Sequence, residues 1–227
     1  MKKNLNTTCI VPFRKGSKGF TEKNFRDFCG EPLWLRSVKQ GHRICDRVIC
    51  SSDSNNLKHQ ELDASTITHQ RPDHLATDAA EMRGVITELV NKYKLDEEIL
   101  ILLQPTSPLR SDASISQALE LYKTGDYSLV ISVTKSDNKC LKYGLQENGV
   151  FKPINKRQYL FSNRQTLPEV YAPNGAVYIF QARDFRKINN FPSDRIGFLE
   201  MDELESLDID TKQDFVFAQE AALTKDR

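Results

Sequence analysis

Apolar residues in this chain fall into short blocks that polar segments separate. The first block covers residues 7–13, and the most apolar one is Glu98–Gln104, with Ile-Leu-Ile-Leu-Leu at its centre. Neither block alternates with polar residues, a pattern typical of strands that are covered on both faces in a parallel sheet. We predict buried strands at both places and further strands over Arg47–Cys50, Ser128–Val133 and Gly175–Phe180.

Stretches with helical periodicity lie between and after these blocks. The predicted helices cover Pro32 to about Gly41, Asp78–Lys94, Asp112–Lys123 and a segment after Thr211, where Asp214 is placed for a capping interaction. Ser51, Ser52 and Asp53 can cap a further helix. The alternation of strands and helices predicts an α/β fold, with a mixed, mostly parallel sheet flanked by helices and with ligands beyond the carboxyl ends of the strands.

Residues 136–172 interrupt this alternation. They contain no long apolar run, show a hairpin-like turn at Gln146–Gly149, and carry several cations, among them Lys142 and Arg164. We predict that this segment, called the arm below, is inserted into an α/β domain formed by residues 1–135 and 173–227.

The composition, with 39% hydrophobic and 28% charged residues, is that of a soluble globular protein with one principal domain. Its 32 basic residues nearly balance 31 acidic ones, without a basic tail, so nucleic acid is not an expected partner. The five cysteines are scattered and show no zinc spacing. Because no segment has the apolar length for export or for a membrane span, we expect a cytoplasmic protein without membrane attachment.

A cationic loop follows the first predicted strand. Between Arg14 and Asn24 it holds four cations and two glycines. Glycines let the backbone approach phosphate oxygens, and Arg and Lys neutralise charge that grows during phosphoryl transfer, so the loop suits a polyphosphate. The spacing is neither the Walker A nor the dinucleotide pattern. A solvated basic turn therefore explains this segment, taken alone, equally well.

An acidic pair, Asp208 and Asp210, lies near the end of the chain. In an extended segment both carboxylates point to the same side, with Ile209 facing the core. Such a pair can hold Mg²⁺, which takes one or two protein carboxylates and completes its shell with water and phosphate. The alternative is that Asp210 only caps the last helix.

Two polar connectors follow other predicted strands. In Gln104–Arg110 the prolines fix a rigid turn at the carboxyl edge of the sheet, where Gln104 and Arg110 can meet an anionic ligand. In Arg71–Asp78, Thr77 or Asp78 can cap a helix, but the sequence shows no structural role for Arg71. The four histidines share no ligand spacing and are predicted to be surface or loop residues: His42, His59, His69 and His74.

Five segments, taken in order, resemble the acylneuraminate cytidylyltransferases, the CMP-sialic acid synthetase family, along nearly the whole chain. They are Arg14–Asn24 (Arg-x-x-Ser-Lys-Gly, then Lys-Asn), Arg71–Asp78 (Arg-Pro-x-x-Leu-Ala-x-Asp), Leu102–Arg110 (Leu-Leu-Gln-Pro-Thr-Ser-Pro-Leu-Arg), Pro173–Ile179 (Pro-Asn-Gly-Ala-x-Tyr-Ile) and Ser206–Thr211 (Ser-x-Asp-Ile-Asp-Thr). Five matches in the same order far exceed what chance produces. The resemblance implies a Rossmann-like nucleotidyltransferase fold and a homodimer, in which the arm serves dimerisation and helps to complete the neighbouring active site.

The resemblance also implies roles for individual residues. The triphosphate of CTP is held by Arg14, Ser17, Lys18, Lys23 and Asn24, with Arg71 and Asp78 near cytosine and ribose. The sugar contacts Gln104 and Tyr178, and across the dimer interface Lys142 and Arg164. Magnesium is held by Asp208 and Asp210, which together with Arg14 and Lys23 are the implied catalytic residues.

The implied reaction transfers CMP from CTP to the anomeric hydroxyl of a nonulosonic acid, an acidic nine-carbon sugar of the sialic acid type, and releases pyrophosphate. Ala172 stands where sialic-acid-activating members commonly carry a basic residue, and Glu81-Met82 replace small polar residues. A related acid of the legionaminic, pseudaminic or ketodeoxyoctonate type therefore stays open. The other alternative is a non-catalytic CTP-binding homologue, against which the retained Lys23, Asp208 and Asp210 argue.

Overall fold

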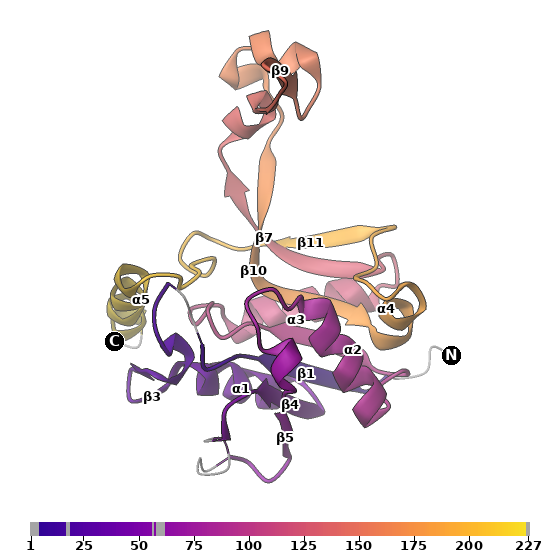
Figure 1. Cartoon of the computed structure of the whole chain (residues 1–227), viewed down its shortest axis with the longest axis vertical. Helices are drawn as coiled ribbons and strands as arrows, with labels where there is room; N and C mark the ends of the chain where they lie inside the picture. The colour runs from indigo at the N-terminus through magenta and orange to yellow at the C-terminus, as the bar shows by residue number, and fades with distance from the viewer. Residues whose placement is uncertain (1–4, 17–18, 56, 58–61, 226–227) are drawn as a thin grey trace.

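A seven-stranded sheet forms the centre of the computed structural model, which describes residues 5–16, 19–55, 57 and 62–225. The strand order is β11-β7-β10-β6-β1-β4-β5 (Figure 1). β10 runs antiparallel to β6 and β7, and the other neighbours are parallel, which confirms the predicted mixed, mostly parallel sheet. The strands are β1 (Thr7–Pro12), β4 (Arg47–Ser52), β5 (Thr66–Gln70), β6 (Ile99–Leu103), β7 (Leu129–Ser136), β10 (Val170–Gln181) and β11 (Ile196–Glu200).

Helices cover both faces of this sheet. One apolar cluster joins α1 and α3 to Cys9, Val11 and Ile101, and a second joins α2 and α4 to Ile10 and Leu100. Successive residues of β1 and β6 thus enter opposite clusters, which explains why these strands are apolar without alternation. The helices are α1 (Leu33–Ile44), α2 (Met82–Tyr93), α3 (Asp112–Lys123) and α4 (Ala182–Ile188).

The last helix, α5 (Lys212–Lys225), lies outside these two layers. It packs against a small hairpin of β2 (Asp27–Phe28) and β3 (Glu31–Pro32) through a third cluster that includes Phe28, Ile209 and Phe215. Ile209 is fully buried, as predicted for the residue between the two aspartates. The end of the chain is therefore brought back next to the segment that follows β1.

Several predicted boundaries are wrong; for example, the strand predicted over Ser128–Val133 runs to Ser136. The helix expected from Asp78 begins at Met82, because residues 77–80 form a turn in which the backbone of Ala80 donates to the carbonyl of Thr77 at 3.2 Å; the Asp78 carboxylate instead pairs with Arg14 at 2.6 Å. The strand expected from Gly175 begins at Val170, where it pairs with the end of β7. Ser51 and Ser52 belong to β4, and Asp53 accepts a hydrogen bond from the backbone of Lys15 at 2.8 Å. The helix expected after Asp53 lies partly outside the described residues.

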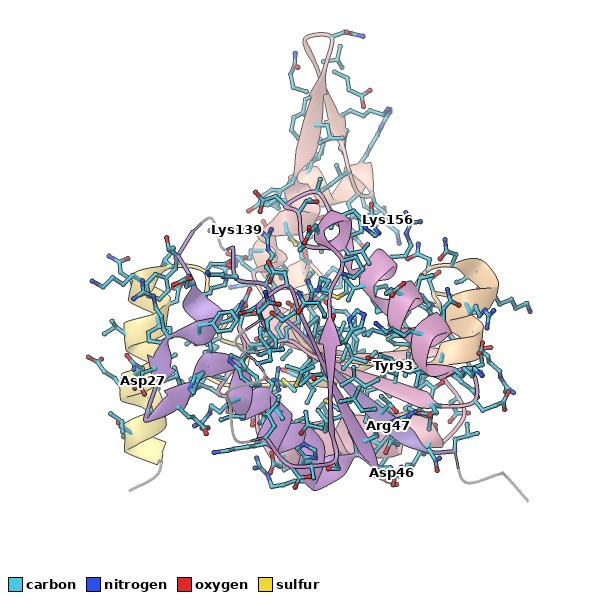
Figure 2. All side chains as sticks on the ribbon, turned by 60° about the horizontal axis from the view of Figure 1, so that its bottom comes forward. Asp27, Asp46, Arg47, Tyr93, Lys139 and Lys156 are labelled. Atoms are coloured by element: carbon cyan, nitrogen blue, oxygen red, sulfur yellow. The ribbon has the colours of Figure 1, made fainter. Side chains whose placement is uncertain are left out.

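The arm stands away from the sheet on the ends of β7 and β10 (Figure 1). It carries a hairpin of β8 (Gly144–Glu147) and β9 (Val150–Pro153), whose turn has positive φ at both Asn148 and Gly149, as expected for the short turn predicted there. Three short 3-10 helices complete it. Figure 2 shows Lys139 and Lys156 on this projecting part of the chain.

Candidate active site

The polar loops that follow β1, β5 and β6 meet at the carboxyl edge of the sheet. They enclose a cleft of about 490 Å³. The cleft lies where β1 has β4 on one side and β6 on the other, the position where open α/β sheets bind ligands. Seven of the residues that the sequence analysis assigned to the active site line it: Arg14, Lys23, Asn24, Arg71, Asp78, Gln104 and Asp210. Ser17 and Lys18 lie outside the described residues.

Lys23 joins the cationic loop to the acidic pair. Its Nζ atom lies 3.0 Å from Oδ1 of Asp210 and also donates a hydrogen bond to the carbonyl of Ile209. The Lys23 side chain is only 13% exposed, whereas that of Asp210 is 77% exposed. A Cβ atom on Gly19 would lie 2.7 Å from the carbonyl oxygen of Asp210, so the loop passes against this segment only because residue 19 is glycine. The cationic loop and the acidic pair therefore meet at one place.

The last helix is capped without Asp210. Oδ2 of Asp214 accepts hydrogen bonds from the backbone and the hydroxyl of Thr211, at 2.7 and 2.9 Å, and Thr211 Oγ1 accepts one from the backbone of Asp214. These bonds lower the pKa of the Asp214 carboxyl. The predicted role of Asp214 is confirmed. The alternative, in which Asp210 only caps this helix, is wrong, and the carboxylate of Asp210 stays available to the cleft.

Asp208 lies next to the cleft, held by the turn that follows β6. The backbone of Ile209 donates to the carbonyl of Thr106 at 2.8 Å. Partial burial raises the pKa of Asp208, a hydrogen bond from Thr106 opposes this, and the negative charge of Asp210 raises the pKa further. Burial, and to a smaller extent the charge of Asp208, also raises the pKa of Tyr178. The tyrosine is thus in the electrostatic neighbourhood of Asp208.

At the other end of the cleft, the two predicted nucleotide ligands Arg14 and Asp78 contact each other. Asn24 is 5% exposed and donates from Nδ2 to the carbonyl of Arg14 at 3.2 Å, while its Oδ1 has no hydrogen-bond partner among the described residues. Arg71 is also 5% exposed and donates from Nη2 to the carbonyl of Ser51 at 2.7 Å. Burial lowers the pKa of Arg71 to about 10. Arg71 therefore has the structural role that the sequence did not show.

An apolar wall completes the cleft on the side of α2. It is formed by Leu75, Met82 and Val85, with Ala80 beside them. Met82 and Val85 are three residues apart at the start of α2 and so share one helix face. Met82 was visible in the sequence only as a departure from the family pattern, and Ala80 and Val85 were not predicted as parts of the site, although the apolar spacing after Asp78 was the available signal.

Gln104 lines the cleft where two further segments that resemble the family meet, Pro173–Ile179 and Ser206–Thr211. The pairing register of β10 shifts between Pro173 and Tyr178, and in this bulge Gly175 has φ +78°. An added Cβ on Gly175 would lie 3.9 Å from Nε2 of Gln104, so the bulge faces the glutamine. Asn174 fixes the bulge, donating to Ser206 Oγ at 2.9 Å and accepting from the backbone of Ala176 at 3.1 Å.

Arg110, expected to meet a ligand, is buried beneath the turn instead. It is 2% exposed, and it donates to the carbonyls of Gln104 and Ala176 at 2.7 and 2.9 Å and to Gln40 Oε1 at 3.1 Å. Burial lowers the pKa of this guanidinium to about 10. Its planar fork thus links the Gln104 turn to the bulge of β10.

We expect Arg110→Met to lower the free energy of unfolding by about 3 kcal/mol, because it leaves several buried acceptors without a donor. Urea denaturation followed by circular dichroism measures this change. Arg43→Met is the control, since its exposed ion pair with Asp112 is of the kind worth less than about 1 kcal/mol. Equal midpoints for both variants would contradict the role of Arg110.

Lys142 and Arg164 lie in the arm and do not reach the cleft of their own chain. Lys142 donates from Nζ to the carbonyl of Ser162 at 2.6 Å, and Arg164 lies 3.4 Å from the carboxylate of Asp137. Their contact with a sugar across a dimer interface stays a prediction.

Comparisons with known proteins agree with this arrangement. The family model described as cytidylyltransferase matches residues 8–224. An N-acylneuraminate cytidylyltransferase of Streptococcus agalactiae serotype III is 28% identical over 224 residues, 93% of this chain and 52% of that protein. The chain thus spans about half the length of this curated relative. A CMP-N,N'-diacetyllegionaminic acid synthase of Legionella pneumophila is 27% identical over 225 residues, 95% of either chain.

Among solved structures, a CMP:2-keto-3-deoxy-manno-octonic acid synthetase complexed with CTP superposes with a TM-score of 0.72. The alignment covers 97% of this chain and 99% of that one, at 12% identity. At this identity the likeness shows the fold, and it confirms the predicted Rossmann-like nucleotidyltransferase architecture.

Proposed function

Because the chain belongs to the cytidylyltransferase family, we propose that it transfers CMP from CTP to the anomeric hydroxyl of an acidic nine-carbon sugar of the sialic acid type. The observation that carries the proposal is the meeting of Lys23 with Asp210 in one cleft, 187 residues apart in the chain. A cation for the triphosphate and a carboxylate for a metal ion are then in contact. These are the two charges that nucleotidyl transfer from a magnesium-bound triphosphate needs.

The nucleotide occupies the part of the cleft between the cationic loop and α2. The apolar wall of Leu75, Met82 and Val85 offers a surface for a base, and Arg14 and Arg71 bring positive charge beside it. Arg14 exchanges its ion pair with Asp78 for phosphate contacts. Asp78, released from this pair, accepts hydrogen bonds from the ribose or the base.

Asp208 and Asp210 hold the proposed Mg²⁺. Carboxylate oxygens are the ligands that Mg²⁺ prefers, and a bound cation would offset both the burial and the repulsion from Asp210 that raise the pKa of Asp208. The described residues contain no group of three or more His, Cys, Asp or Glu side chains that could bind a metal by themselves. The donor set therefore fits an ion that takes its other ligands from phosphate and water. When bound, the ion neutralises charge on the triphosphate.

The sugar enters beside Gln104 and Tyr178, and its anomeric oxygen attacks the α-phosphorus of CTP. As the new P–O bond forms, the hydroxyl gives its proton to water, and the bond from the α-phosphorus to pyrophosphate breaks in line with the attack. Lys23, fixed by Ile209 and Asp210, neutralises the charge that develops on the departing pyrophosphate. The chain thus acts mainly by positioning and by charge neutralisation.

The proposed homodimer uses the arm. Large apolar side chains are exposed there, with Phe161 at 90% and Tyr143 at 59% exposure, and Phe151 and Ile154 are also exposed. Apolar side chains gathered on one projecting element are typical of a protein interface, and a second copy of this chain is the proposed partner. In that dimer Lys142 and Arg164 of the partner's arm face the carboxylate or substituents of the sugar.

A cytoplasmic location is part of the proposal. None of the five cysteines, which all lie within the described residues, forms a disulfide, as expected in a reducing compartment. Within the described part of the chain, no helix is both long and apolar enough to cross a membrane.

The substrate is tested by incubating the protein with CTP and a panel of acids: N-acetylneuraminate, a legionaminic acid, a pseudaminic acid and ketodeoxyoctonate. We expect pyrophosphate release with at least one nine-carbon acid, only when Mg²⁺ is present. The named Legionella relative makes the legionaminic type the first alternative. Release with ketodeoxyoctonate alone would reassign the sugar. No release with any acid, together with measurable CTP binding, would favour the non-catalytic CTP-binding homologue.

A further inference from the structure

A chain of three buried polar side chains lies under the nucleotide end of the cleft. Arg71, Ser51 and His69 are 5%, 0% and 1% exposed. Arg71 donates from Nε to Ser51 Oγ at 3.3 Å, and the same oxygen lies 3.0 Å from Nδ1 of His69. The prediction that His69 is a surface or loop residue is therefore wrong. It lies in β5, paired in register with Ser51 of β4.

The direction of each hydrogen bond in this chain follows from its donors. A guanidinium only donates, so Ser51 Oγ accepts from Arg71, and the hydroxyl can give its own hydrogen to Nδ1 of His69. His69 is then neutral, with its proton on Nε2. Burial lowers the pKa of His69, as do the charges of Lys92 and Arg71, while Glu88 opposes them; the net lowering is consistent with a neutral ring.

The far side of the imidazole faces α2. Nε2 of His69 is buried without a hydrogen-bond partner among the described residues, and Oε1 of Glu88 is 3.8 Å away. The ring of Tyr93 packs edge-on against it, with 6.0 Å between centroids; Figure 2 shows Tyr93 at the end of α2. The imidazole is thus held in place by packing, and Ser51 is the group that it hydrogen-bonds.

We propose that His69 is a positioning residue for the nucleotide site, which acts through Ser51 on Arg71. By accepting from the Ser51 hydroxyl, it orients the oxygen lone pairs toward Nε of Arg71 and fixes the plane of the guanidinium. Ser51 accepts hydrogen bonds from Nε and Nη2 of Arg71, and we infer that Nη1 is the nitrogen that meets a ligand in the cleft that Arg71 lines. The inference rests on the proposed function, because it takes CTP as the ligand that Arg71 meets.

The test compares His69→Leu, His69→Asn and Ser51→Ala by direct titration with CTP and Mg²⁺. His69→Leu removes the acceptor, whereas His69→Asn keeps an oxygen near the position of Nδ1. We expect His69→Leu to weaken CTP binding about tenfold and His69→Asn to stay within about threefold of the unsubstituted protein. The KM for the acid sugar should stay unchanged in both, since the network touches Arg71 and not Gln104.

Ser51→Ala shows whether the effect passes through the hydroxyl. Ser51→Ala should weaken CTP binding about as much as His69→Leu. The double variant that combines these two substitutions should bind CTP no more weakly than either single variant, because all three break the same link. Additive losses would overturn the inference, as would unchanged CTP affinity in His69→Leu. If the unsubstituted protein does not bind CTP, the proposed function fails, and the inference with it.

A spectroscopic signature tests the same arrangement when a variant folds poorly. In the unsubstituted protein, ¹⁵N chemical shifts of the His69 ring should show a neutral imidazole protonated at Nε2. Protonation at Nδ1 would overturn the proposed direction of the hydrogen bonds.

Discussion

Asp210→Asn is expected to lower pyrophosphate release at least about 10²-fold, the loss that follows from removing one preorganised electrostatic group at a transition state. The substitution keeps the shape of the side chain but removes the charge that pairs with Lys23 and that is proposed to hold Mg²⁺. The Mg²⁺ concentration for half-maximal rate should rise as well. Both quantities are measured with the acid that proves active in the substrate panel.

The protein fold should survive this change. The Asp210 side chain is 77% exposed, and the cap of α5 depends on Thr211 and Asp214. Asp194→Asn is the control, since it removes one exposed carboxylate at the amino end of β11, the opposite edge of the sheet. Release that is undiminished in Asp210→Asn would remove the metal assignment.

Lys23→Met should lower turnover by about 10²-fold or more for a different reason. Methionine fills similar space but leaves the carbonyl of Ile209 and the carboxylate of Asp210 without their cation, and no charge then meets the departing pyrophosphate. Single-turnover measurements with saturating CTP separate this effect from weaker nucleotide binding.

Lys15→Met is the matched control in the same loop. The Lys15 side chain is 60% exposed and lies 3.7 Å from Glu22, outside the cleft lining. Its loss should change turnover less than about threefold, as expected for a surface ion pair. If both lysines had equal effects, the overall charge of the loop, and not the position of Lys23, would explain the rate.

The proposed metal site and Lys23 share one carboxylate, and this links the two predictions. In the structure, Asp210 contacts Lys23, while Asp208 has a raised pKa that the charge of Asp210 helps to cause. Because the residues act as a unit, the double variant of Lys23 and Asp210 should lose less than the product of the single losses.

Much of the fold could be predicted from local patterns. Strands β1 and β6 were visible as apolar runs, because a strand covered on both faces must be apolar at every position. The start of α5 was visible in Thr211 and Asp214, because a helix cap depends on residues three apart in sequence. Asp78 misled the prediction for α2: its carboxylate pairs with Arg14, 64 positions earlier in the chain, and the helix begins at Met82.

Among the site residues, the sequence by itself determined which charges were available and in what order. It placed the cationic loop after β1 and the two aspartates before α5, and the matched segments identified the family. Only the tertiary structure decided that Lys23 reaches Asp210, that Arg110 and Arg71 are buried, and that His69 lies under the cleft. The physical reason is that a polar side chain takes its role from its hydrogen-bond partners. Those partners come from neighbouring strands and returning loops, whose register no local pattern specifies.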